Sequence, residues 1–365
     1  MKVVFDDQVF CWQEFGGISR YFYELAKRVA HEENFSVSVV APLYVNRYLA
    51  EGGVSVKGLH IPKARNSGRI ISALNGLVAP ALIRSEHPDV LHETYYYRRR
   101  SLAPRGCATV VTVFDMTHEK FPDYFLARDR TSEAKRAAVM RADRVICISA
   151  NTQRDLIDIF GVSPEKTAVI HLGFTLTEQV ATAVPLTESR PFLLYVGPRG
   201  GYKNFNALLN AYAASQVLRN NFSLVAFGGG HFSVAEAEHI HTLGLQDSVK
   251  QRSGDDRLLS ILYRQASAFV YPSLYEGFGI PPLEAMGFDC PVICSNTSSI
   301  PEVVGDAARL FDPEDIDALR AAIEAVVGSS DLRDDLVRRG RERIQHFSWD
   351  RTAKETLDIY RELRQ

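Results

Sequence analysis

Two glutamates, Glu276 and Glu284, bracket a glycine-rich turn that follows a buried, strand-like run in the segment YPSLYEGFGIPPLEAM. Gly277 and Gly279 allow a tight turn, and we expect a helix to begin at about Pro282. Uncovered N–H groups at a helix N-terminus attract anions, whereas carboxylates accept hydrogen bonds from sugar hydroxyls. The segment predicts a site for a phosphate beside a sugar, and its structural alternative is a plain turn with two surface glutamates.

A second segment, LYVGPRGGYKNF, places Arg199 and Lys203 among glycines after another strand-like run. Arginine presents a planar fork to phosphate oxygens, and lysine presents a mobile point charge. Two cations on a flexible loop suit a diphosphate. The alternative is a solvated basic loop with no ligand.

A third segment, EFGGISRY, lies between the first expected strand and the first expected helix. Gly16 and Gly17 permit close approach of another part of the backbone at this turn. The segment lacks the G-x-G-x-x-G spacing of dinucleotide-binding turns, which argues against a nicotinamide-dependent enzyme.

Short β-branched runs alternate with amphipathic helical patterns along most of the chain, as in βαβ units of a parallel sheet. One helix is indicated by Phe205, Leu208, Leu209 and Tyr212, which share a helical face. The expected strands are 2–7, 35–41, 54–60, 89–92, 108–114, 144–149 and 167–172, followed by 192–197, 222–227, 249–252, 268–272, 291–295 and 309–311.

A length of 365 residues favours two domains, each with its own core. We expect a Rossmann-like domain over 1–175, a linker over 176–190, a second Rossmann-like domain over 191–348, and a helix over 349–365 that packs back on the first domain. Ser348 and Asp350 are the candidates for the N-cap of that helix. The predicted class is α/β, with two doubly wound domains.

Composition excludes several classes of protein. With 42 Lys and Arg against 44 Asp and Glu, the chain has no overall positive charge for binding nucleic acid. No apolar run reaches the length of about 18 residues that a membrane-spanning helix needs, and the N-terminus does not read as a signal peptide. The five cysteines are scattered without a zinc-ligand pattern, which favours reduced thiols and a cytoplasmic location.

These motifs together resemble the retaining glycosyltransferases of the GT-B fold in the large group 4 family. The resemblance covers nearly the whole chain. It includes the E-x7-E signature in EGFGIPPLEAM, the VGPRGGYKN loop, ADRVICISANTQRDL followed by VIHLGF, the GGISRY loop and the terminal FSWDRTAKETLDIY helix. It implies two domains facing across a cleft and a nucleotide diphosphate sugar as donor.

The resemblance also implies roles for individual residues. Arg199 and Lys203 match the cations that bind the donor diphosphate and stabilise the leaving group, and Glu284 matches the ribose ligand. Glu276 matches a catalytic-site carboxylate beside the donor sugar. Further implied donor contacts are Gly16, Gly17, Gly277, Phe278, Gly279 and Ile280, with Arg252 and Ser253 near the nucleobase. The donor-site segments contain no Asp-x-Asp metal motif, and the Lys and Arg can fill the cationic role of a divalent ion, so we expect no metal ion and no cofactor besides the donor substrate.

One position departs from the family pattern. Many members carry a His directly before the Asp that follows the strand expected at 108–114, and here Phe114 precedes Asp115. His118 lies three residues beyond Asp115 and is a candidate to replace the missing His near the donor sugar or acceptor. Without such a replacement, a nucleotide-sugar-binding subunit with weak or no activity becomes the alternative.

Between residues 57 and 105, nine basic residues stand against three acidic ones, and the stretch 69–84 is apolar with an Arg at each end. This composition predicts peripheral contact with anionic lipid at the inner face of the membrane, and its alternative is an ordinary core helix beside a solvated loop. The predicted activity is transfer of a hexosyl group from a nucleotide sugar to a lipid-linked glycan acceptor. GDP-mannose is the preferred candidate donor, by resemblance to mannosyltransferases of bacterial polysaccharide assembly. A sugar-nucleotide epimerase on the same scaffold is a further alternative.

Overall fold

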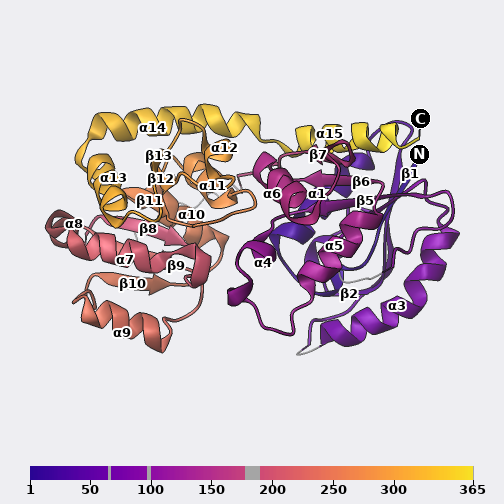
Figure 1. The fold of residues 1–365 in the computed structure, drawn as a ribbon, viewed down its shortest axis with the longest axis horizontal. Helices are drawn as coiled ribbons and strands as arrows, with labels where there is room; N and C mark the ends of the chain where they lie inside the picture. Colours follow the sequence, from indigo (N-terminus) through magenta and orange to yellow (C-terminus); the bar gives the residue numbers. More distant parts are fainter. Residues whose placement is uncertain (65–66, 97–99, 177–189, 365) are drawn as a thin grey trace. The chain divides into compact units, whose positions relative to one another are not determined.

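A computed structural model describes residues 1–64, 67–96, 100–176 and 190–364. The chain divides into two compact units (Figure 1). Met1–Gly173 and Ser348–Gln365 form the first, called here the N-terminal domain, and Phe174–Phe347 form the second, the C-terminal domain. All but the ends of the linker expected at 176–190 lie outside the described residues.

The N-terminal domain is built on a seven-stranded parallel sheet in the order β3-β2-β1-β4-β5-β6-β7. Its strand order reverses between β1 and β4, and such a reversal places ligands at the carboxyl ends of the strands. The strands are β1 (Lys2–Phe5), β2 (Ser36–Tyr44), β3 (Val56–His60), β4 (Val90–Glu93), β5 (Ala108–Val113), β6 (Arg144–Cys147) and β7 (Thr167–Val169).

Helices cover both faces of this sheet. On β1, Val4 belongs to a core cluster with residues of α3, whereas the next residue, Phe5, has its ring 5.7 Å from Phe22 of α1. Because neighbouring side chains of a strand point to opposite faces, α1 and α3 lie on opposite sides of the sheet. The helices are α1 (Gly17–Val29), α2 (Arg47–Ala50), α3 (Ser67–Ser85), α4 (Thr117–Lys120), α5 (Thr131–Arg141), α6 (Ala150–Phe160) and α15 (Trp349–Glu362), with short 3₁₀ turns at Val9–Cys11, Pro122–Tyr124 and Pro164–Lys166.

Helix α15 joins the N-terminal domain on the same face as α1. It begins after Ser348, whose side chain accepts a hydrogen bond from the Arg351 N–H, so Ser348 rather than Asp350 is the N-cap. Tyr360 Oη lies 2.6 Å from His92 Nδ1 on β4, and His92 Nε2 lies 2.9 Å from Thr112 Oγ1 on β5. Only glycine fits at position 173 beside the start of α15, because a Cβ there would lie 2.4 Å from the Trp349 backbone nitrogen.

Acid should destabilise the N-terminal domain through His92. Burial lowers the pKa of His92 to about 3, whereas a histidine in the unfolded chain titrates near 6.5. The stability contributed by neutral His92 is therefore fully present above about pH 6.5 and is lost toward pH 3, at about 1.4 kcal/mol per pH unit. Urea unfolding between pH 7.5 and 4 measures this dependence.

The control compares two variants with the unmodified chain. His92→Gln removes the titrating group and should flatten the pH dependence of the unfolding free energy. His31→Gln changes an exposed histidine of the same domain and should leave the dependence intact. Equal slopes for all three proteins would contradict the assignment.

The C-terminal domain contains a six-stranded parallel sheet in the order β10-β9-β8-β11-β12-β13, with its reversal between β8 and β11. Its strands are β8 (Phe192–Val196), β9 (Ser223–Phe227), β10 (Val249–Arg252), β11 (Ala268–Tyr271), β12 (Val292–Ser295) and β13 (Arg309–Phe311). Its helices are α7 (Phe205–Ala214), α8 (Gln216–Asn221), α9 (Val234–Thr242), α10 (Asp256–Gln265), α11 (Ile280–Gly287), α12 (Ile300–Val304), α13 (Ile316–Gly328) and α14 (Ser330–Arg343), with 3₁₀ turns at Gly201–Lys203 and Ile344–His346.

The predicted elements are present in both domains. Every strand expected from the sequence is formed, with ends that differ by no more than three residues. The four residues expected on one face of a helix at 205–212 are all buried on α7. Within the described ranges, no helix combines the length and apolar character needed to cross a bilayer.

Candidate active site

The carboxyl ends of β8 and β11 bring two of the predicted segments together. These strands are neighbours at the reversal of the C-terminal sheet, so the loops that follow them meet at one edge. Lys203 Nζ lies 2.6 Å from Glu276 Oε1, and their side chains are only 17% and 12% exposed. A cation and a carboxylate from separate motifs thus form one charged centre.

Serines that follow β12 hold the Glu276 loop in place. Ser298 Oγ accepts a hydrogen bond from the Glu276 N–H at 3.0 Å, and Ser299 Oγ lies 2.8 Å from the carbonyl oxygens of Glu276 and Phe278. The Lys203 loop is tied in as well, since the Leu274 N–H donates to the Tyr202 carbonyl. Our sequence reasoning missed both serines, although their place after a strand next to β11 was a usable signal.

Helix α11 begins two residues earlier than expected, at Ile280 rather than Pro282. Gly279 is its N-cap, with φ +113°, a conformation that favours glycine. Pro281 and Pro282 occupy the first turn and have no N–H to donate. The helix N-terminus therefore offers fewer donors to an anion than the sequence motif led us to expect.

Glu284 lies on α11 and is held by a buried tyrosine. Tyr263 Oη donates to Glu284 Oε2 at 3.3 Å. Burial, and next the Glu284 carboxylate, raise the pKa of Tyr263 well above its usual value, so its hydroxyl remains a donor at neutral pH. This contact orients the carboxylate, which is itself only partly buried.

The resemblance implies that Glu284 binds the donor ribose, so Glu284→Ala should weaken donor binding by about 10- to 100-fold, the loss expected for one or two hydrogen bonds from hydroxyls to a charged group. Glu284→Gln keeps an acceptor for Tyr263 and for one hydroxyl and should lose less. Calorimetric titration with a nucleotide diphosphate sugar measures the affinity, and thermal unfolding checks that both variants fold. Unchanged affinity in Glu284→Ala would remove this residue from the ribose site.

Arg199 and Lys203, the two cations predicted to bind the diphosphate, have different surroundings: Lys203 pairs with Glu276, whereas Arg199 is tied to another part of the domain. Its side chain is only 2% exposed, and its Nε donates to Glu236 Oε1 at 2.9 Å. Its other nitrogens donate to carbonyl oxygens of the turn that follows β9, namely Gly228, Gly229, Gly230 and His231. Most of its N–H groups are therefore engaged within the domain.

The turn that Arg199 holds consists of three consecutive glycines in left-handed conformations, with φ of +85°, +68° and +72°. A Cβ at Gly229 would lie 2.8 Å from the Arg199 guanidinium, so the turn and the arginine fit closely. Burial alone would raise the pKa of Glu236, but hydrogen bonds from Ser233 and Arg199 hold it below its ordinary value. We therefore propose that Arg199 positions the glycine turn while Lys203 contacts the donor.

Arg252 and Ser253, the predicted nucleobase contacts, lie at the carboxyl end of β10. The Arg252 carbonyl accepts a hydrogen bond from the Gly228 N–H, which joins them to the glycine turn. β10 is separated from β8 by β9, so this end lies about 10 Å from the end of β8. That spacing is compatible with a nucleobase here and a diphosphate at Lys203.

The N-terminal domain gathers its own predicted residues around a small hollow of about 20 Å³. Ile18, Asp115, His118 and Lys135 are among its lining residues. Gly17 is the first residue of α1 and Gly16 its N-cap, so the predicted glycine loop directly precedes Ile18. Asp115 and His118 are thus brought together with the start of α1.

His118 and Phe114 have different surroundings. The His118 ring stacks on Phe125 with centroids 3.8 Å apart, and burial followed by the charge of Lys135 lowers its pKa. Phe114 is buried, with its ring 5.4 Å from that of Tyr21. The position that holds a His in many family members therefore belongs here to an aromatic core. His118 shares the small hollow with Asp115, and its Nε2 lies 3.8 Å from Asp129 Oδ2.

Lys135 is a residue that sequence reasoning missed. Its side chain is 2% exposed, and Nζ donates to Glu119 Oε2 and to the Asp115 carbonyl oxygen, each at 2.8 Å. In the sequence it resembles an ordinary solvent-facing lysine of α5. Here it fixes the segment that carries Asp115 and His118. Among the described residues, no group of three or more His, Cys, Asp or Glu is arranged to hold a metal ion.

Comparison with known proteins extends over both domains. Residues 15–178 match the family described as Glycosyltransferase Family 4, and residues 178–343 match Glycosyl transferases group 1. The chain is 28% identical to O-antigen chain mannosyltransferase B of Escherichia coli over 386 aligned positions, which cover 99% of this chain and 100% of that protein.

Solved structures share the fold along the full length. Sucrose-phosphate synthase of Thermosynechococcus elongatus superposes with a TM-score of 0.75 at 20% identity, covering 99% of this chain and 98% of that one. HepE of Anabaena, solved in complex with UDP and glucose, gives a TM-score of 0.73 at 19% identity, covering 98% and 99%. The chain therefore belongs to the family 4 glycosyltransferases of GT-B fold and is similar to O-antigen mannosyltransferases.

Proposed function

We propose that this glycosyltransferase moves a mannosyl group from GDP-mannose to a lipid-linked glycan, with retention of the anomeric configuration. The observation that carries the proposal is the ion pair between Lys203 and Glu276 at the reversal of the C-terminal sheet. A diphosphate that arrives there meets a partly buried ammonium group, and the sugar meets a carboxylate held by Ser298 and Ser299.

In the proposed reaction, the bond between the anomeric carbon and the phosphate oxygen breaks while the acceptor oxygen bonds to the same face of that carbon. The leaving phosphate takes the acceptor proton. Lys203 stabilises the negative charge that develops on the diphosphate, and Glu276 orients the sugar through its hydroxyls. Neither Glu276 nor Glu284 serves as a covalent nucleophile.

The choice of donor is supported by the name of the full-length relative from Escherichia coli, a mannosyltransferase of the O-antigen chain. The Anabaena neighbour was solved with UDP and glucose, so UDP-glucose is the competing donor to test. The acceptor is proposed to be a glycan because the Escherichia coli relative is named for the O-antigen chain. It is proposed to be lipid-linked because the basic stretch at 57–105 is suited to contact with an anionic membrane, where such an acceptor would lie.

The test incubates the full chain with GDP-mannose or UDP-glucose and a mannose-terminated acceptor carrying a short lipid. Release of nucleoside diphosphate together with an elongated product is expected for GDP-mannose, and NMR of the product should show the α-anomer. Turnover of UDP-glucose alone would overturn the donor assignment, and a β-linked product would overturn retention.

A second candidate, a subunit that binds nucleotide sugar without turning it over, is favoured by the burial of Phe114 at the usual His position. The same assay separates the two. Calorimetric binding of GDP-mannose without any release of GDP, with every acceptor tried, would favour the binding subunit.

A further inference from the structure

Helix α3 of the N-terminal domain presents a row of large apolar side chains to solvent. They recur at helical spacing on one face, opposite the buried face that packs on the sheet. Soluble surfaces rarely carry such contiguous apolar area without a partner. The exposed side chains are Ile70 (65%), Leu74 (47%), Leu77 (79%) and Val78 (47%).

The buried face fixes the orientation of α3. Asn75 Oδ1 accepts a hydrogen bond from the Leu43 N–H, and Asn75 Nδ2 donates to the Leu43 carbonyl and to Asp7 Oδ2, all at 2.9 Å. Ile71, Ala79 and Ile83 on the same face are buried. The helix is therefore locked against β1 and β2, and its apolar row points outward.

The charge around this row is positive. Ser67–Ser85 contains no acidic residue, and Arg69 and Arg84 are exposed near its two ends. The next acid along the chain, Glu86, is neutralised by Lys2 at 2.6 Å and lies 3.7 Å from Lys57. Arg65, Arg98 and Arg99 of the same basic stretch lie outside the described residues.

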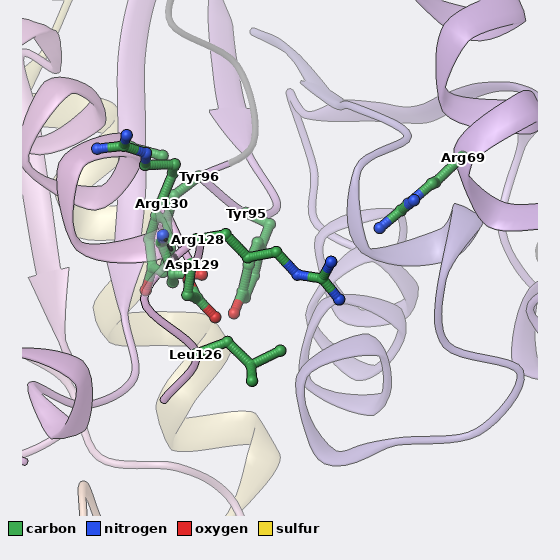
Figure 2. A pocket seen from close by; sticks show the side chains of 9 residues that line it. Arg69, Tyr95, Tyr96, Leu126, Arg128, Asp129 and Arg130 are labelled. Atoms are coloured by element: carbon green, nitrogen blue, oxygen red, sulfur yellow. Dashed lines mark hydrogen bonds between the residues drawn. The ribbon is translucent and has the colours of Figure 1, made fainter. Parts of the chain in front are cut away.

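Arg69 also lines a pocket of about 420 Å³ that adjoins the first turn of α3. Figure 2 shows Arg69 and Arg128 extending toward one another from α3 and from the turn before α5, with Tyr95 and Leu126 nearby. Arg130 in the wall pairs with Glu133, and Asp129 accepts from the Thr131 N–H. Within the described ranges, neither Arg69 nor Arg128 has an acidic partner.

We propose that the outer face of α3 and this arginine pocket form one membrane-binding surface for anionic phospholipid. The apolar row enters the interface between headgroups and acyl chains, and the guanidinium groups of Arg69 and Arg128 bind a lipid phosphate. Charge complementarity selects this occupant, because an apolar row on a helix that carries arginines near both ends and no acidic residue matches acyl chains below a layer of phosphates. The inference deepens the proposed function, since it would hold the enzyme where a lipid-linked acceptor lies.

The test is flotation of the full chain with vesicles of phosphatidylcholine, alone or with about one-third phosphatidylglycerol. We expect the unmodified chain to float with the anionic vesicles only. Arg69→Glu with Arg128→Glu should reduce partitioning more than tenfold, since each cation near such a surface contributes about 1 kcal/mol. Leu74→Ser with Leu77→Ser should also reduce it about tenfold by removing apolar contact.

The matched control is Lys27→Glu with Lys354→Glu, which changes the net charge equally on α1 and α15, helices of the opposite face. It should retain partitioning. The proposed membrane-binding surface would be wrong if this control lost as much vesicle partitioning as the arginine variant, or if all variants bound vesicles equally. It would also be wrong if the unmodified chain failed to float. A further arm adds inorganic pyrophosphate to the unmodified chain. If pyrophosphate lowers flotation as much as the Arg69→Glu with Arg128→Glu substitutions do, and if the Leu74→Ser with Leu77→Ser variant floats as well as the unmodified chain, the pocket binds free phosphate rather than lipid.

Membrane binding and catalysis fail separately in these experiments. Transfer to a water-soluble acceptor should persist in the Arg69→Glu with Arg128→Glu variant and in the Leu74→Ser with Leu77→Ser variant, because neither changes a residue of the C-terminal donor site. Flotation without any transfer would therefore count against the proposed function while leaving the membrane surface in place.

Discussion

Replacing Lys203 with alanine is expected to lower kcat by about 10²- to 10³-fold while the protein remains folded. In the proposed reaction the Lys203 ammonium group offsets the negative charge that develops on the leaving diphosphate, and loss of one such contact costs about 3–4 kcal/mol of transition-state stabilisation. The variant also leaves the partly buried carboxylate of Glu276 without its cation at 2.6 Å. Initial rates of nucleoside diphosphate release measure the effect.

Two further variants make this result specific. Arg257→Ala removes an exposed cation from α10 of the same domain and should leave the rate unchanged. Combining Lys203→Ala with Glu276→Gln should cost less than the sum of the two single losses, because the residues act as a pair. Near-normal turnover by Lys203→Ala would exclude this lysine from the donor site.

Arg199→Ala is expected to lower the free energy of unfolding of the C-terminal domain by about 3–5 kcal/mol, the usual cost of removing one member of a buried ion pair. Glu236 would lose its cation, and the carbonyl oxygens of the glycine turn would lose their common donor. Hydrogen–deuterium exchange of peptides from β8 and β9 in increasing urea measures the loss, because both tryptophans of the chain, Trp12 and Trp349, belong to the N-terminal domain.

Arg199→Lys keeps the charge but has no planar fork to reach several carbonyl oxygens, so it should recover only part of the stability. The contrast with Lys203→Ala, which should remain folded and lose mainly rate, is the decisive comparison. If the Arg199→Ala protein has normal stability but no activity, the result would instead support the direct contact of Arg199 with phosphate that the motif predicts.

The fold was predictable because its signals are local. Buried parallel strands read as continuous β-branched runs, and the amphipathic period of α7 is visible in four residues. The site was predictable only as a set of motifs. That Lys203 meets Glu276 depends on β8 pairing with β11, a contact between residues far apart in the chain.

Arg199 and Lys135 show what sequence patterns leave open. Both are cations in polar segments, and such residues usually face solvent. Each side chain is buried here and is paired with a carboxylate and with backbone carbonyl oxygens from other segments. Arg199 pairs with Glu236 of α9 and the Gly228 carbonyl, and Lys135 pairs with Glu119 of α4 and the Asp115 carbonyl. Spacing along the chain carries no information on either encounter.

The contact between α15 and β4 has a consequence for biosynthesis. Helix α15 completes the core around Tyr21 and His92, yet it follows the whole C-terminal domain in the chain. During translation the C-terminal domain has all its strands before the N-terminal domain has its last helix. The N-terminal domain, most of which is synthesised before the C-terminal domain, thus completes its fold only after it, and until then the face of α1 that α15 will cover is open to chaperones and to aggregation.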